Sequence, residues 1–336
     1  MDRRSFLAFG APAIGLGVAM PAAWAGSPNA GCGGFDEARE RFLTLPGNKS
    51  LAVVVRKDDA VIWQNLFEPD AALFVGSAVK TFILATYLQQ VEAKLLSEDE
   101  LLPVNNDIRS LASPVFGSNL NESQNLAGEA TARTVLEAMI SHSDNTATDI
   151  ALRRVGVDKV RAFIASAGLT ATLIPRSTRV MVSYFAGAPP GVDLGWDGAK
   201  QIAEGHMPTT PRSPINDQET MISTASELVS YYSKAVAGGF FSQAATLTEF
   251  RRIQAMADAI ARIVPPGIAA YAKGGSVDWQ DFHALCAPGQ MIIGSGSVTF
   301  CFTLNWTGPD SSAPEVSAAY AKSAAGMLAA AAQCFT

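Results

Sequence analysis

The chain has 336 residues, of which 48% are apolar and 17% are charged. This is the composition of an ordinary globular protein, and the length suits one large domain or two interleaved ones. It carries 25 basic and 31 acidic residues, and no basic stripe runs through the sequence. This charge pattern argues against a nucleic-acid partner.

The first 25 residues are typical of an export signal. Arg3-Arg4 resembles the twin-arginine motif, and a modest apolar stretch follows it, ending in small residues at Ala25. We therefore predict export to the periplasm or the exterior and cleavage after Ala25. A membrane anchor is the first alternative, but the stretch is short and broken by glycine and proline. A lipoprotein at Cys32 is the second, but residues 29–31 lack the usual aliphatic residue.

The mature part begins with a predicted helix and two predicted strands. Residues 35–43 have helical periodicity with acidic residues in the first turn. Residues 51–56 and 61–66 are β-like, and the polar residues 57–59 between them are typical of a hairpin. Residues 77–93 predict a long, mostly apolar helix that is buried on several sides.

Helices dominate the middle of the chain, and strands return near its end. Helical patterns cover residues 132–142, 146–155, 157–167, 224–237 and 243–263. Between residues 175 and 216 the periodicity fails and six prolines occur, which predicts a long loop. Strand patterns follow at residues 269–277, 282–286 and 298–306, and a last helix runs from about 313 to 334.

Strands on both sides of a helical block imply one sheet built from both ends of the chain. We therefore predict an α+β fold whose sheet part covers about 26–72 and 266–336. The inserted helical part covers about 73–265. A cleft between the sheet and the helices is the natural place for a catalytic site.

Ser77 and Lys80 form the only S-x-x-K pattern in the sequence. Residues three apart on a helix share a face, so the hydroxyl and the amine can meet. Serine becomes a useful nucleophile when a base removes its proton, and a lysine whose pKa is lowered by burial can be that base. The competing interpretation is a surface serine beside an amphipathic lysine.

Two further polar motifs follow the first one in the chain. Ser143-Asp144-Asn145 lies between two predicted helices, where it could also be simple helix capping. Lys273-Gly274-Gly275-Ser276 ends a predicted strand, where glycine permits close approach of the backbone. An ordinary strand-end turn with a solvated lysine is the alternative there.

Together, in the order S-x-x-K, S-D-N and K-G-G, these motifs resemble the signature of class A β-lactamases and penicillin-binding proteins. The residues after the second motif, Thr146-Ala147, and the segment 224–228 continue the likeness, which spans about 35–335. The resemblance implies a β-lactamase-like fold with an antiparallel sheet. It also implies a monomer without cofactor or metal, acting on a small-molecule β-lactam or a related amide or ester.

The resemblance also implies a role for each motif residue. Ser77 is the acylated nucleophile and Lys80 its base, while Ser143 passes a proton to the leaving group. The substrate is bound by Asn145, Lys273, Gly275 and Ser276. The oxyanion hole consists of the backbone N–H groups of Ser77 and Ser276.

Two features depart from the family pattern. Class A enzymes carry a glutamate on an Ω-shaped loop that activates the deacylating water, but the segment after Ser177-Thr178-Arg179 holds no acid. Tyr184 falls near the expected place, and Asp193, Asp197 and Glu204 are the next acids. In addition, the residue after the motif lysine usually carries a hydroxyl, but here it is Gly274.

These departures leave three functions open. The first is β-lactam hydrolysis through an acyl-enzyme. The second is an esterase or a D,D-peptidase, and the third is a penicillin-binding protein that acylates and stops.

The chain has four cysteines, and disulfides between them are stable if the chain is exported. Cys32 and Cys334 can pair if the two ends pack together, and Cys286 and Cys301 lie in neighbouring predicted strands, so a second bridge is possible. Four cysteines allow three pairings, which the sequence does not resolve. Metal binding is disfavoured, since the chain has three histidines and no C-x-x-C pair.

Overall fold

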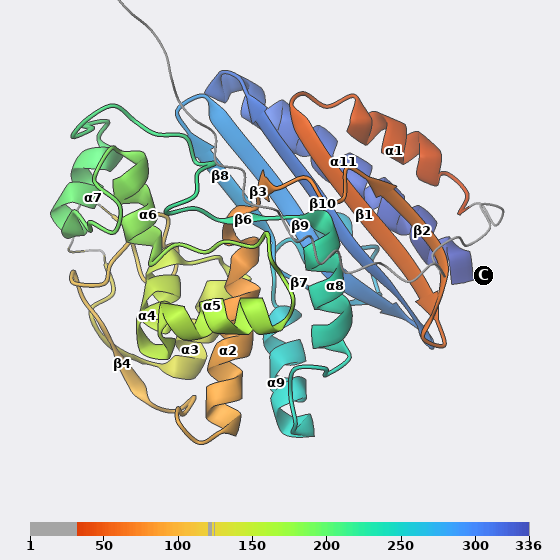
Figure 1. The fold of residues 1–336 in the computed structure, drawn as a ribbon, viewed down its shortest axis with the longest axis horizontal. Coiled ribbons are helices and arrows are strands. Elements are labelled where there is room, and N and C mark those ends of the chain that lie inside the picture. Colours follow the sequence, from red (N-terminus) through yellow and green to blue (C-terminus); the bar gives the residue numbers. More distant parts are fainter. Residues whose placement is uncertain (1–31, 120–122, 124, 336) are drawn as a thin grey trace, which may run out of the picture.

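The computed structural model describes residues 32–119, 123 and 125–335 (Figure 1). The predicted export signal and its cleavage site lie outside the described residues. An antiparallel sheet with strand order β2-β1-β10-β9-β7 forms the centre, and β8 also pairs with β9. Its strands are β1 (Asn48–Lys57), β2 (Ala60–Phe67), β7 (Ala269–Ala272), β8 (Gly275–Trp279), β9 (Phe282–Ile293) and β10 (Gly296–Thr307).

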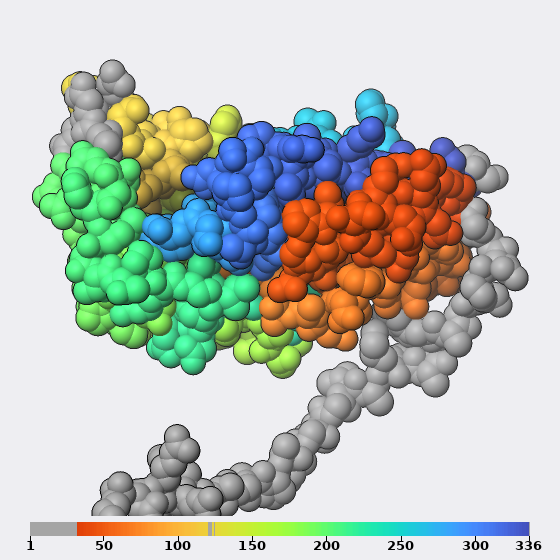
Figure 2. All heavy atoms as spheres, turned by 90° about the horizontal axis from the view of Figure 1, so that it is seen from above, coloured from red at the N-terminus to blue at the C-terminus, as the bar shows by residue number. Residues whose placement is uncertain are grey.

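Both faces of the sheet are covered. Helices α1 (Phe35–Leu43) and α11 (Ala313–Ala332) share one apolar core with the sheet, whereas α8 (Ala225–Val236) belongs to the core on the other face. Side chains alternate between the two faces of a strand. Accordingly, Val53 points into the first core and Val54 into the second. Figure 2 shows the N-terminal and C-terminal segments, in red and blue, side by side on one surface.

The helical block between the strands is built around α2 (Lys80–Glu92), which is buried along most of its length as predicted. Two short sheets, β3 (Leu73–Phe74) with β6 (Ile222–Ser223) and β4 (Leu101–Val104) with β5 (Gly128–Thr131), tie the block together. The other helices of the block are α3 (Ala132–Ser141), α4 (Asn145–Val155), α5 (Val157–Ser166), α9 (Ala244–Gln254) and α10 (Ile260–Ile263).

The prediction of an unstructured loop over 175–216 is wrong. This stretch contains α6 (Thr178–Phe185) and α7 (Gly195–Ala203). Its prolines stand before, between and after these helices, where they mark helix boundaries and do not interrupt a helix. Ser177 caps α6 by accepting a hydrogen bond from the backbone N–H of Val180.

Three other boundaries differ from the prediction. The strand predicted over 269–277 is divided into β7 and β8, with Lys273 and Gly274 between them. The helix predicted over 243–263 is divided into α9 and α10, and the break brings Ala259 against Gly274 beside the sheet. Strand β9 continues well past residue 286, through Pro288. Because β8 pairs with residues 282–286 and β7 with 289–292, Pro288 falls at the junction of the two, where the sheet needs no N–H donor.

A disulfide joins Cys32 and Cys334, across 302 positions of the sequence. Cys286 and Cys301 are free and buried, with their sulfurs 3.9 Å apart, so the second bridge is not formed. Within the described residues, no helix is long and apolar enough to cross a membrane.

Candidate active site

Ser77 lies in a tight 3₁₀ turn, Gly76–Val79, that leads directly into α2. The turn starts with Gly76 at φ +53°, a left-handed conformation that suits glycine. A side chain at Gly76 would come within 2.9 Å of the backbone of Ser276. The half-buried Ser77 is therefore held against the start of β8 by backbone packing.

Lys80 is the first residue of α2 and is completely buried. Its amine donates to the backbone oxygen of Ser143 at 2.6 Å and to Oδ1 of Asn145 at 2.8 Å, and Ser143 Oγ lies 3.2 Å away. Burial, reinforced by the positive charge of Lys273, holds the pKa of Lys80 well below its ordinary value. Such a lysine can exist as a neutral amine, which is the form that takes up a proton.

Ser143 and Asn145 are fixed in position by Asp144 between them. Ser143 has φ +56°, an uncommon conformation for a residue with a side chain. The buried Asp144 stabilises it by accepting hydrogen bonds from the backbone N–H groups of Ala147, Val115 and Phe116. Asn145 donates to the backbone oxygen of Leu111, so its Oδ1 stays directed at Lys80. The middle residue of the S-D-N motif is therefore a structural anchor.

Lys273 connects β7 to β8 and is also completely buried. Its amine donates to the backbone oxygen of Gly274 at 2.7 Å. Burial lowers the pKa of Lys273 to about 8, against an opposing effect of the nearby carboxylate of Asp258. An amine with this pKa is mostly charged at neutral pH and can attract an anionic substrate.

Gly275 brings the third motif against the first one. A Cβ added at Gly275 would lie 2.7 Å from the backbone nitrogen of Ser77 and 2.1 Å from the backbone oxygen of Val75. Only glycine allows the two backbones to approach so closely. The start of β8 therefore runs beside the Ser77 turn, with the backbone of Ser276 next to it.

Lys80 thus meets Ser143 and Asn145, and the backbone of Gly275 meets the Ser77 turn, but Ser77 and Lys80 form no hydrogen bond with each other. Ser143, Lys273, Gly275 and Ser276 line a cavity of about 150 Å³, to which Asp258 and Arg262 also contribute. Gly274 occupies the position that usually supplies a hydroxyl. A Cβ added at Gly274 would lie 2.8 Å from Cβ of Ala259, so the neighbouring side chain leaves no room for a larger residue.

The three acids considered as replacements for the missing glutamate are engaged elsewhere or exposed. Asp193 accepts hydrogen bonds from Arg179 and from the backbone of Gly195. The side chain of Asp197 pairs with Lys200 and is 89% exposed. Glu204 is also exposed at the surface. Of the described residues that line the cavity beside Lys273, none is one of these acids.

Tyr184 is buried on α6, with the Arg212 guanidinium 4.4 Å from its ring centre. Arg212 also donates to the backbone oxygen of Tyr184. The ring of Tyr184 therefore faces a cation.

One important residue, Asp149, was missed by the sequence analysis. Its carboxylate is 2% exposed and accepts hydrogen bonds from the N–H and hydroxyl of Thr178 and from the N–H of Arg179. Burial raises its pKa to about 6. Asp149 follows Asn145 by four residues and so lies on the same face of α4. That spacing was the available signal, and it places Asp149 where it holds α6 near Lys80.

Within the described residues, no three or more histidine, cysteine or carboxylate side chains are grouped so that they could hold a metal ion.

The sequence matches the profile of the beta-lactamase enzyme family over residues 49–285, most of the chain. A comparison with curated proteins found no match.

Several solved structures share the fold. A beta-lactamase from Chitinophaga pinensis has a TM-score of 0.67 at 15% identity, covering 90% of this chain and 99% of its own. A beta-lactamase from Sphaerobacter thermophilus has 0.64 at 19% identity, covering 89% and 95%. A mutant of the last common ancestor of Gram-negative bacteria class A beta-lactamase has 0.65 at 16%, covering 88% and 98%. At these identities the likeness concerns the fold, and it confirms the predicted α+β architecture.

Proposed function

Because the chain belongs to the beta-lactamase enzyme family and has its fold, we propose that it is a serine hydrolase acylated at Ser77 by β-lactams. The observation that carries the proposal is the environment of Lys80. A buried amine that donates to two carbonyl oxygens uses two hydrogens there. In its neutral form it keeps a lone pair for the proton of a serine hydroxyl.

The remaining motif residues supply the other parts of acyl transfer. The N–H groups of Ser77 and Ser276 stabilise the oxyanion, which is consistent with the close approach of their backbones. Ser143, 3.2 Å from the Lys80 amine, carries the proton onward to the leaving nitrogen. Lys273 attracts the substrate carboxylate, and the Asn145 amide contacts the amide carbonyl of the substrate.

Deacylation is the slow step in this proposal. The carboxylates considered for the hydrolytic water are paired or exposed, and the buried Asp149 is occupied by three hydrogen bonds from α6. A missing general base costs about 10²–10⁴ in rate. Penicillins should therefore form a persistent acyl-enzyme.

An esterase or D,D-peptidase is the second candidate, and Gly274 favours the esterase of the two. Without a hydroxyl side chain at that position, the contact to a β-lactam carboxylate is weaker, which matters less for an ester substrate. Turnover of simple esters that exceeds turnover of nitrocefin would support this second function.

Intact-mass spectrometry after brief incubation with benzylpenicillin tests the proposal. Opening of the lactam ring adds the whole penicillin to the serine, so the intact protein should gain one full penicillin mass. After digestion, this gain should lie on the peptide that contains Ser77. Ser77→Ala should gain nothing, with Ser166→Ala, a serine exposed on α5, as the control. Labelling of Ser77→Ala equal to that of the wild type would rule out this nucleophile.

We also propose export through the twin-arginine route, on the basis of Arg3 and Arg4 and the modest apolar stretch that follows them. Replacing both with lysine should leave the uncleaved protein in the cytoplasm. An unchanged periplasmic yield of that double variant would contradict the proposal.

A further inference from the structure

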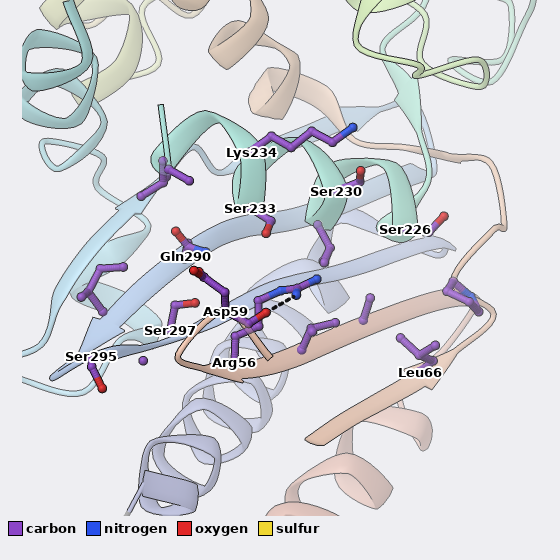
Figure 3. A pocket seen from close by; sticks show the side chains of 18 of the residues that line it. Arg56, Asp59, Leu66, Ser226, Ser230, Ser233, Lys234, Gln290, Ser295 and Ser297 are labelled. Carbon is purple, nitrogen blue, oxygen red and sulfur yellow. Dashed lines mark hydrogen bonds between the residues drawn. The ribbon is translucent and has the colours of Figure 1, made fainter. Parts of the chain in front are cut away.

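A second and larger cavity lies between α8 and the sheet (Figure 3). Its volume is about 630 Å³, against about 150 Å³ for the cavity beside Lys273. Most of the residues that line it come from β1, α8, β9 and the turn into β10, with others from β2, α9 and the loops next to β1 and β2. Ser77, Lys80, Ser143 and Lys273 are not among them. It is therefore separate from the candidate active site.

The cavity exists because the face of α8 that covers it is made of short side chains. Ser226, Ser230, Ser233 and Ala237 recur at intervals of four, three and four residues, which places them along one side of the helix. Opposite them, β1 contributes Ala52. Protein interiors are normally close-packed, and larger side chains along this line would fill the gap between helix and sheet.

Two polar groups in the cavity wall lack partners. Gln290 is 5% exposed, and its Nε2 donates to Thr299 Oγ1 at 2.8 Å. Its carbonyl oxygen makes no hydrogen bond to any described residue, and the side chain reaches from the sheet toward α8 in Figure 3. The Nε of Arg56 is also buried without a partner in the described part of the chain. The Gln290 oxygen has no partner among the described residues and is not fully covered by protein, so it is open to a ligand in the cavity.

The charges around the cavity favour an anion. Arg56, Lys234 and Arg251 line it, against the two acids Asp59 and Asp70. Asp70 already accepts a hydrogen bond from Ser226, whereas the exposed Lys234 has no partner among the described residues. This positive excess stands out in a chain with a net charge of −6.

The rest of the lining is apolar. Val54, Val229 and Val236 are buried side chains at the cavity wall, and Ile292 and Leu66 extend it along the sheet. A cavity of this size, with an apolar wall and a few converging polar groups, has the character of a small-molecule site.

From these observations we infer that the cavity between α8 and the sheet binds a small amphipathic carboxylic acid. The apolar chain of the ligand lies along the valine wall, and its carboxylate pairs with the guanidinium of Arg56. Gln290 accepts from a ligand hydroxyl or a bridging water.

Calorimetric titration with sodium decanoate below its micellar concentration tests this inference, with decanol as the neutral probe of equal chain length. We expect one saturable site for decanoate in the wild type and at least about tenfold weaker binding of decanol. Arg56→Gln should weaken decanoate binding about tenfold. This variant changes a partly exposed side chain and should fold normally.

A cavity-filling variant locates the site. Ser233→Phe should abolish decanoate binding, whereas Ser166→Phe, which places the same ring on an exposed position of α5, should not. Thermal unfolding of both variants shows whether they are folded. Absence of saturable binding to the wild type would overturn the inference. So would equal binding by decanol, by Arg56→Gln or by folded Ser233→Phe.

Discussion

Gly274 and Gly275 determine how closely the third motif approaches the nucleophile, and they do so in different ways. Gly275 faces backbone atoms of the Ser77 turn, which cannot move aside without displacing the turn itself. Gly274 faces only the methyl group of Ala259. Gly275 is thus required because backbone atoms lie against it, whereas Gly274 is required because one neighbouring side chain lies against it.

This difference predicts the effect of restoring the usual hydroxyl. Gly274→Ser should lower the free energy of unfolding by about 1–3 kcal/mol through overpacking, and adding Ala259→Gly should recover most of it. Urea unfolding measures both, and Gly33→Ala, which meets nothing within 4 Å, is the control. A single Gly274→Ser variant as stable as the wild type would show that the contact with Ala259 is not restrictive.

At the scale of residues, the sequence predicted the motif members but not all of their partners. Ser77, Lys80 and Asn145 could be proposed because spacing and residue type indicate chemistry. Asp149 was missed: its spacing of four from Asn145 indicated a shared helix face, but its role depends on contacts with Thr178 and Arg179, about 30 positions away. Which residue faces which across such a distance depends on how helices pack.

Among the elements, most helices and the strands of the first hairpin were predicted within a few residues, whereas the ends of β9, the breaks within 243–263 and 269–277, and the segment 175–216 were not. Its helices α6 and α7 are short, and their ends are fixed by tertiary contacts. The pair Arg179–Asp193 at 2.7 Å links the start of α6 to the start of α7. Proline content alone therefore gave the wrong prediction here.

The hairpin of β8 and β9 contains a titratable contact. His283 on β9 is buried against Trp306, and its two ring nitrogens face the carboxylate of Asp278 at 2.6 Å and the backbone oxygen of Gly308 at 2.9 Å. Both partners are acceptors, so only the protonated ring satisfies both. Burial alone favours the neutral ring, but the hydrogen bonds and charges of these partners prevail and raise the pKa of His283.

This contact predicts a pH-dependent stability. A raised pKa in the folded state gives stabilisation that is complete below about pH 6.5 and is lost as pH rises through the folded pKa. The difference in unfolding free energy between the wild type and His283→Phe should therefore be largest near pH 5.5 and smaller near pH 8.5. Asp278→Asn should remove much of this dependence. A difference that stays constant or grows with pH would contradict the assignment.

For the whole molecule, the two ends of the chain act as one structural unit. α1 and α11 share a core with the sheet, and the bridge between Cys32 and Cys334 closes nearly the entire described chain into a loop. The sequence offered this pairing only as one of three, because connectivity depends on which ends meet in space.

Removing the bridge should reduce stability. Cys334→Ser is expected to lower the free energy of unfolding by about 2–5 kcal/mol, because the long loop is no longer constrained in the unfolded state. Alkylation under native conditions should leave Cys286 and Cys301 unmodified, since both are buried, and unfolding should expose two thiols in the oxidised protein. An unchanged melting temperature of Cys334→Ser would show that the bridge contributes little.

The central claim is that this molecule holds the parts for acylation without an evident base for deacylation. Stopped-flow measurement with nitrocefin on the wild type tests it most directly. The account predicts a burst of about one equivalent followed by slow turnover, because water attack lacks about 3–5 kcal/mol of general-base assistance. Steady turnover at about hundreds per second, as in an efficient enzyme, with no burst would contradict it.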